Sequence, residues 1–307
     1  MHGYEPPIAD PADYAVPGNF RMVDAHVHWW DHADKTVTWG VSSRNWQHPR
    51  LMWSWRLDQE RFSAPEYRAE ASALGVIKVV HVQHATMATP AAAETAWLQS
   101  VANRYGWPNA IMARGFLADP SAPGELATHT EYANFRGVRD CSEMNLVGTP
   151  EWNVGYKALL EMGGICELMI THEHFEAAYQ VAKKFPDQVL ILCHAGIPVV
   201  SKLDDYQQAW RTALRKLAQA PNVVVKISGL SSGSPANFYA VTMRQWIREC
   251  VETFGPERSM FASNFHVERL FVTLPKLFRT YRRAVDDYTP SEQDAMFAGT
   301  AERVYRI

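Results

Sequence analysis

Short apolar and β-branched runs recur along the chain, and most of them are followed by a stretch with helical periodicity. The runs that read as strands are residues 22–27, 76–83, 110–116, 135–139, 165–170, 189–193, 223–227 and 259–262. Strands that alternate with helices imply a parallel sheet, because each helix is the crossover between neighbouring strands. Eight such units predict an α/β fold in which the sheet closes into a single (β/α)8 TIM barrel.

The helical pattern is clearest over residues 238–254. Apolar side chains fall there on one face at a period of 3.6, and the pattern stops at Gly255-Pro256, a common helix end. Further helices are expected over residues 65–74, 91–105, 154–162, 175–185 and 205–218. No glycine-rich phosphate-binding motif follows any strand, which removes the usual reason to expect a nucleotide-binding sheet.

Residues 21–307 therefore read as one barrel domain, preceded by an N-terminal extension over residues 1–20. One segment, residues 29–63, shows neither period. It holds six of the eleven tryptophans: Trp29, Trp30, Trp39, Trp46, Trp53 and Trp55. Because this loop follows the first strand, it belongs at the carboxyl end of the strands, where TIM-barrel active sites lie. We expect it to cover the site, with Trp29, Trp30, Trp53 or Trp55 lining it; an insert that only shields the rim is the alternative.

Composition narrows the classes of partner. A net charge of −3 gives no long-range field that would attract nucleic acid or an anionic membrane. The four cysteines form no C-x-x-C pair, and no signal-peptide pattern or run of 18 apolar residues occurs. We expect a cytoplasmic protein that acts on a small molecule and binds neither nucleic acid nor membrane; a homo-oligomer is left open.

The strongest local signal for chemistry is the run Val23-Asp24-Ala25-His26-Val27-His28. Residues two apart on a strand point to the same face, so His26 and His28 are expected to project together into the barrel mouth. Two neighbouring imidazoles can share a metal ion or polarise one carbonyl oxygen. Two histidines buried for packing alone are the alternative, and the position at the end of the first strand favours the site.

The run VDAHVHWWD resembles the strand-1 signature of the amidohydrolase superfamily (amidohydrolase-related family 2), and its aromatic pair followed by Asp31 resembles the lactonase and sugar-lactone hydrolase branch. Later segments are similar to the same branch: VVHVQ at 79–83, CHAGIPV at 193–199, VKISGL at 225–230 and RSMFASNF at 258–265. The resemblance covers nearly the whole chain from Arg21 and implies a barrel hydrolase.

The resemblance implies that His26, His28 and His194 line the site, as the strand-1 pair and the strand-6 histidine. At strand 8 the chain departs from the pattern, because Asn264 stands where most members place an Asp that binds metal and accepts a proton. No convincing bridging lysine is present, since Lys226 reads equally as a solvated or salt-bridged side chain. His26, His28 and His194 could hold one divalent metal, most simply zinc, or act without metal around an oxyanion.

The candidate substrate-binding residues indicate that the substrate is an anion. Arg139 resembles the arginine that lactonase-branch enzymes use against a substrate carboxylate, and a salt bridge to Asp140 or Glu143 is the alternative. The further candidates for substrate contact lie near or beyond the ends of predicted strands, and they are Arg114, Gln83, Trp30 and His172. His172 reads equally well as the start of the helix that follows it.

The leading hypothesis is a hydrolase that opens a lactone bearing a carboxylate or several hydroxyls. Replacements for the missing strand-8 base are Asp31, Asp140, Glu143, His266 or one of the clustered histidines. A metal-independent lactone isomerase, a non-oxidative decarboxylase and a catalytically dead binding barrel are the alternatives. We expect His26, His28, His194 and Asn264 to converge at the carboxyl end of the strands.

Overall fold

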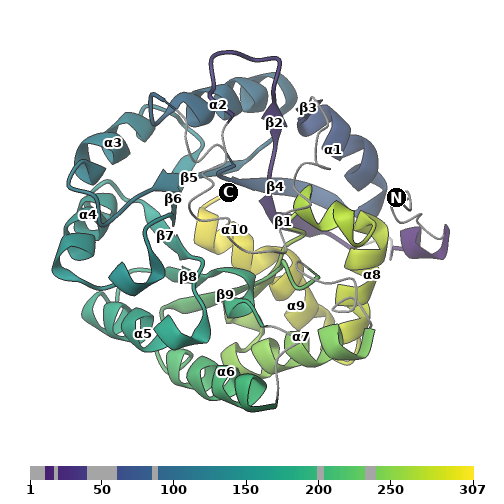
Figure 1. Ribbon diagram of the computed structural model, residues 1–307. Coiled ribbons are helices and arrows are strands. Elements are labelled where there is room, and N and C mark those ends of the chain that lie inside the picture. Colours follow the sequence, from purple (N-terminus) through teal and green to yellow (C-terminus); the bar gives the residue numbers. More distant parts are fainter. Residues whose placement is uncertain (1–10, 17–19, 40–60, 85–88, 199–203, 232–239) are drawn as a thin grey trace, which may run out of the picture.

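The computed structural model describes residues 11–16, 20–39, 61–84, 89–198, 204–231 and 240–307. Eight parallel strands form one sheet in the order β1-β4-β5-β6-β7-β8-β9-β10. Their bounds are β1 Met22–Val27, β4 Val76–Val82, β5 Ala110–Gly115, β6 Phe135–Asp140, β7 Ile165–Leu168, β8 Leu190–Leu192, β9 Val223–Ile227 and β10 Ser259–Phe261. Helices surround these strands in Figure 1. The fold is the (β/α)8 TIM barrel predicted from the sequence, and all eight predicted strands are present.

The helices between the strands are α1 Ala64–Ala71, α2 Ala93–Tyr105, α3 Ala122–His129, α4 Pro150–Glu161, α5 Phe175–Lys184, α6 Asp204–Leu217 and α7 Ala240–Phe254. After β10 come α8 Leu274–Ala284, α9 Pro290–Asp294, a π-helix at Ala295–Gly299 and α10 Thr300–Tyr305. The six predicted helices are found, whereas α3, α8, α9 and α10 were not among the predictions.

The barrel closes next to the expected site. β10 and β1 share no ladder, but the chain just beyond β10 pairs with the end of β1 through a parallel bridge between Val27 and Phe265. The amide of Asn264 donates to the carbonyl oxygen of His26 at 2.9 Å, and that of His28 to Phe265 at 2.7 Å. Asp24 strengthens this seam, since its buried carboxylate accepts from the amide of Ser263 at 2.8 Å. The seam therefore fixes Asn264 against His26.

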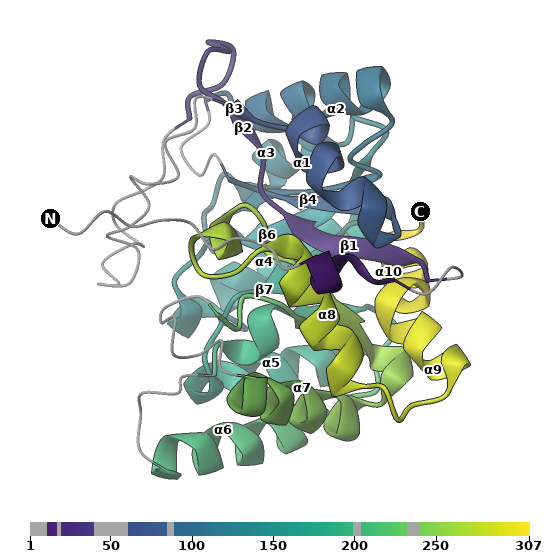
Figure 2. The same ribbon diagram turned by 90° about the vertical axis from the view of Figure 1, so that its right-hand side faces the viewer.

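The inside of the barrel is packed rather than hollow. Side chains from the strands meet the C-terminal segment, where Ala298, Ala301, Val304 and Tyr305 join the inner apolar cluster. In Figure 1, α10 lies over the centre of the ring, and in Figure 2 it lies at the end of the barrel away from β2. The C-terminal helix thus closes one end of the barrel, and the candidate site lies at the other end.

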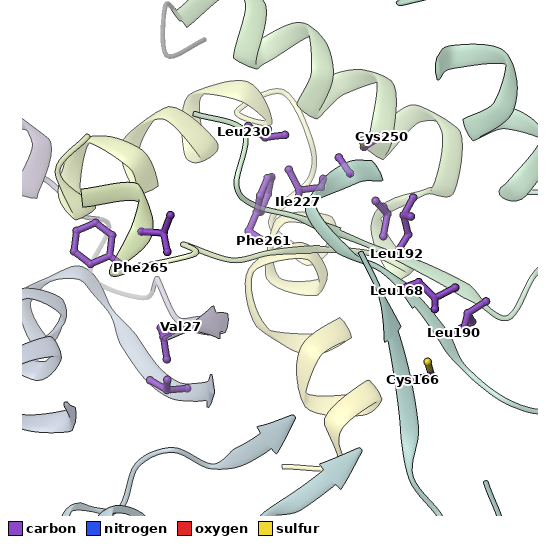
Figure 3. Packing of buried hydrophobic residues seen from close by; sticks show 14 of the residues in the cluster. Val27, Cys166, Leu168, Leu190, Leu192, Ile227, Leu230, Cys250, Phe261 and Phe265 are labelled. Carbon is purple, nitrogen blue, oxygen red and sulfur yellow. The ribbon is translucent and has the colours of Figure 1, made fainter. Parts of the chain in front are cut away.

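Outward-facing strand residues pack under the helices. Leu192, Ile227 and Phe261 from β8, β9 and β10 belong to one cluster with Cys250 of α7, and Figure 3 shows this packing. Burial of such side chains contributes about 1.5–3 kcal/mol each to folding. The outer core therefore holds the strands whose ends carry the candidate site.

The Trp-rich segment begins and ends as a two-stranded antiparallel ribbon of β2 Trp30–Asp31 and β3 Arg61–Phe62, in which Trp30 pairs with Phe62. Trp46, Trp53 and Trp55 lie outside the described residues, so the lid prediction is tested only at the stem of the loop. Among the helices that the structure describes, none is both long and apolar enough to span a bilayer.

Candidate active site

His26 and His28 lie side by side at the end of β1. Their Nε2 atoms are 3.0 Å apart, and both side chains are buried. The Nδ1 of His28 lies 2.9 Å from the carbonyl oxygen of Val82. A carbonyl only accepts, so this Nδ1 carries the hydrogen and the Nε2 of His28 offers a lone pair. The Nε2 of His28 therefore directs its lone pair toward the Nε2 of His26.

His194 reaches the same place from the turn after β8. Its ring centroid lies 4.7 Å from that of His26, and its Nδ1 contacts the hydroxyl of Ser228 at 2.9 Å. The backbone of His194 is left-handed, with φ of 53°, which costs about 1–2 kcal/mol in a residue with a side chain. Gly229 makes room for the ring, because a Cβ there would lie 2.6 Å from the Nδ1 of His194.

Burial keeps these imidazoles neutral. Desolvation, followed by nearby cations, holds the pKa of His26 and of His28 well below its usual range. Desolvation, with Arg139 and Lys226 as further causes, lowers the pKa of His194 to about 3. At neutral pH the three rings are therefore uncharged, and each has one nitrogen with a lone pair.

Arg139, at the end of β6, brings a positive charge to the histidines. Its side chain is 7% exposed, and its guanidinium donates to the carbonyl oxygen of Gln83 at 3.0 Å. Its Nε has no hydrogen-bond partner, and no carboxylate pairs with it among the residues that the structure describes. Asp140 instead accepts from the indole of Trp152 at 2.6 Å, and Glu143 is exposed. The salt bridge weighed as an alternative for Arg139 is thus not formed.

An aromatic group borders the histidine pair on the side of the Trp-rich loop. Trp30 stacks on His84 with centroids 4.8 Å apart, and His84 lies 6.0 Å from His28. His266 packs against Trp30 at 5.1 Å and against Phe62 at 4.2 Å. Trp30 is therefore joined to the cluster through His84 and His266.

Two other predicted residues have partners elsewhere. His172 lies in a short 3-10 helix, His172–His174, and packs edge-on against Tyr206 of α6 at 4.6 Å. This matches the alternative interpretation of His172 as the start of a helix. Arg114 pairs with Glu125 of α3 at 3.4 Å. The structure brings together Arg139, Gln83 and Trp30, and it turns His172 and Arg114 toward outer helices.

Asn264 occupies the strand-8 position beside His26. Its backbone is left-handed, with φ of 56°, and its side-chain amide donates to Glu268 at 3.4 Å. Glu268 is fully buried, and no pattern in the sequence singled it out. His26, His28 and His194 thus lie together where β1 and β8 end, and the backbone of Asn264, beyond β10, is bonded to His26.

The described side chains give a partial match to a metal site. The Nε2 atoms of His26 and His28 fit one ion, since two nitrogen ligands of tetrahedral zinc lie about 3.3 Å apart. Among the described residues, however, the one trio with all donor atoms within 4.8 Å is His26, Glu167 and Cys193. Catalytic zinc takes three protein ligands, and Glu167 already pairs with Lys226. The three-histidine set expected from the sequence is not assembled within this distance, and Glu167 would have to leave Lys226 to complete a zinc site.

A buried charged layer lies beneath the histidines, and the sequence analysis missed most of it. Lys226 of β9 pairs with Glu167 of β7 at 2.5 Å, and both side chains are fully buried. Tyr305 donates to the same carboxylate at 2.5 Å and Cys193 at 3.1 Å. The sequence signal for this layer was one charged residue in each of two otherwise apolar strands. Such a pattern indicates an ion pair inside the barrel.

The comparisons with known proteins agree with this architecture. A family model described as amidohydrolase matches residues 23–307. The uncharacterized protein y4mH of Sinorhizobium fredii is 31% identical over 94% of this chain and 99% of its own. An L-fucono-1,5-lactonase of Burkholderia ambifaria is 24% identical over 93% of this chain and 95% of its own.

Solved structures show the same fold. An amidohydrolase of Burkholderia multivorans, crystallised with bound zinc, superposes with a TM-score of 0.78 at 21% identity, over 94% of this chain and 100% of that one. The match of the family model extends over all eight strands. The resemblance inferred from the sequence motifs is confirmed, and the chain belongs to the amidohydrolase family.

Proposed function

We propose that this hydrolase opens the ring of a lactone that carries a carboxylate group. The observation that supports this most is the buried guanidinium of Arg139, which has no carboxylate partner among the described residues and faces neutral histidines. A buried charge is costly unless an opposite charge pairs with it, so a substrate anion would complete the site. The likeness to a lactonase from Burkholderia ambifaria supports the ring-opening reaction.

In the proposed reaction, Arg139 binds the carboxylate and places the lactone carbonyl near the pair His26 and His28. A water molecule attacks the carbonyl carbon, and the hydrogen-bonded pair of His26 and His28 accepts its proton. The low pKa of both imidazoles disfavours their protonated form. The proton therefore passes to the ring oxygen as the carbon–oxygen bond breaks, and a hydroxy acid leaves the site.

The test is a comparison of lactones that differ in one carboxylate. We expect kcat/KM for 5-oxotetrahydrofuran-2-carboxylate to exceed that for γ-butyrolactone by about 30-fold or more, because a buried ion pair contributes about 2 kcal/mol or more. Proton release during ring opening measures both rates. His28→Gln serves as the control that turnover belongs to this site. Equal rates on the two lactones, or none on either, would refute the proposal.

Asn264→Asp tests how the strand-8 position takes part. The substitution adds a negative charge at a position whose backbone amide is bonded to His26, so it can repel an anionic substrate and supply an anionic metal ligand. We expect kcat/KM for the carboxylate-bearing lactone to fall by about 5–150-fold, or roughly 1–3 kcal/mol. We also expect more zinc to survive dialysis, as measured by elemental analysis.

The control for Asn264→Asp is Asn103→Asp, because Asn103 is an exposed amide on α2. This variant adds the same charge far from the histidines and is expected to leave zinc content and turnover unchanged. If Asn264→Asp also leaves both quantities unchanged, position 264 lies outside the chemistry.

A further inference from the structure

A second polar group lies against Arg139 and is not used in the reaction described above. Gln83, at the end of β4, is 2% exposed, and its backbone carbonyl accepts from the guanidinium of Arg139 at 3.0 Å. Its side-chain nitrogen donates to the sulfur of Cys141 at 3.2 Å. Gln83, Arg139 and Cys141 thus form one connected unit at the edge of the histidine cluster.

The thiol of Cys141 determines which end of the Gln83 amide remains available. A thiol has one hydrogen to donate, and that of Cys141 lies 3.5 Å from the carbonyl oxygen of Arg139. Burial raises the pKa of Cys141 to about 11, so the thiol keeps this hydrogen at neutral pH. Its sulfur can then only accept, and the amide must turn its nitrogen toward it. The Oε1 of Gln83 is left on the other side.

Two complementary polar atoms of this unit are therefore unsatisfied. The Oε1 of Gln83 and the Nε of Arg139 are both buried and have no hydrogen-bond partner among the described residues. A buried polar atom without a partner costs about 1–3 kcal/mol, so such atoms call for an explanation. The guanidinium needs an acceptor, whereas the amide oxygen needs a donor and would be repelled by a carboxylate.

We propose that Gln83 determines specificity by accepting a hydrogen bond from a substrate hydroxyl on the ring carbon adjacent to the one that bears the carboxylate bound by Arg139. The inference rests on the proposed lactonase function and narrows its substrate to lactones of hydroxylated, sugar-type acids. A site built to bond a hydroxyl rejects the analogue that lacks it, because the amide oxygen then stays buried and unpaired.

The experiment uses two lactones that both carry the carboxylate: 5-oxotetrahydrofuran-2-carboxylate and its 3-hydroxy derivative. For the wild type we expect kcat/KM to be at least about 10-fold higher with the hydroxyl. Gln83→Met keeps the length of the side chain and removes the acceptor, so the preference should fall below about threefold. Gln180→Met, which replaces an exposed amide on α5, should keep the full preference.

A second variant tests the role of the thiol. Cys141→Ala removes the acceptor that orients the amide of Gln83, so the hydroxyl preference should fall while Gln83 itself is retained. A wild type without preference, or a Gln83→Met variant that keeps it, overturns the inference and leaves the proposed function standing. If the wild type neither hydrolyses the two lactones nor binds their ring-opened acids in calorimetry, the proposed function fails and the inference with it.

Discussion

Arg139→Met is expected to raise the KM for a carboxylate-bearing lactone by at least about 30-fold and to change kcat less. The guanidinium is buried at the edge of the histidine cluster, and its charge is balanced by no described carboxylate. An ion pair with bound substrate exists in both the ground state and the transition state, so its loss appears mainly in KM. Removing one partner of such a buried pair costs about 2–5 kcal/mol, or roughly 30-fold to several thousand-fold.

Steady-state kinetics with 5-oxotetrahydrofuran-2-carboxylate and with γ-butyrolactone measure this effect. The uncharged lactone should respond little to Arg139→Met, because it offers the guanidinium no anion. Arg104→Met is the matched control, since Arg104 is an exposed arginine on α2. An unchanged KM for the charged lactone would remove Arg139 from substrate binding.

Sequence periodicity predicted the barrel well, because its strands are short apolar runs bounded by polar turns. The helices α3, α8 and α9 were missed, and each of them has a proline in its first turn. Proline reads as a turn signal in a sequence, yet the first helical turn tolerates it, because amides there need no partner within the helix. In α3 the dipeptide Pro123-Gly124 strengthened the false turn signal.

The candidate site likewise depends partly on local sequence patterns and partly on contacts between residues that are far apart in the sequence. Alternation along one strand was enough to place His26 and His28 together. The contacts of His194 with Ser228, and of Gln83 with Cys141, join residues 34 and 58 positions apart. Such pairs depend on strand register and on the left-handed turn after β8, which no local pattern encodes. Only the structure therefore shows that His194 does not complete a three-histidine metal site with His26 and His28.

The buried ion pair beneath the histidines carries the second large prediction. Lys226 and Glu167 are both fully buried, and the carboxylate also accepts from Tyr305 and Cys193. Lys226→Met leaves this carboxylate in the barrel interior without its cation. Breaking a buried pair in this way costs about 3–5 kcal/mol. The free energy of unfolding, measured by urea denaturation, should fall by about that amount.

The double variant Lys226→Met/Glu167→Gln separates the lost pair from a general packing defect. With both charges removed, no uncompensated ion stays buried, so the double variant should be more stable than Lys226→Met alone. Lys157→Met, at an exposed position on α4, should change stability by less than about 0.5 kcal/mol. If Lys226→Met unfolds at the same urea concentration as the wild type, the ion pair does not contribute to the barrel core.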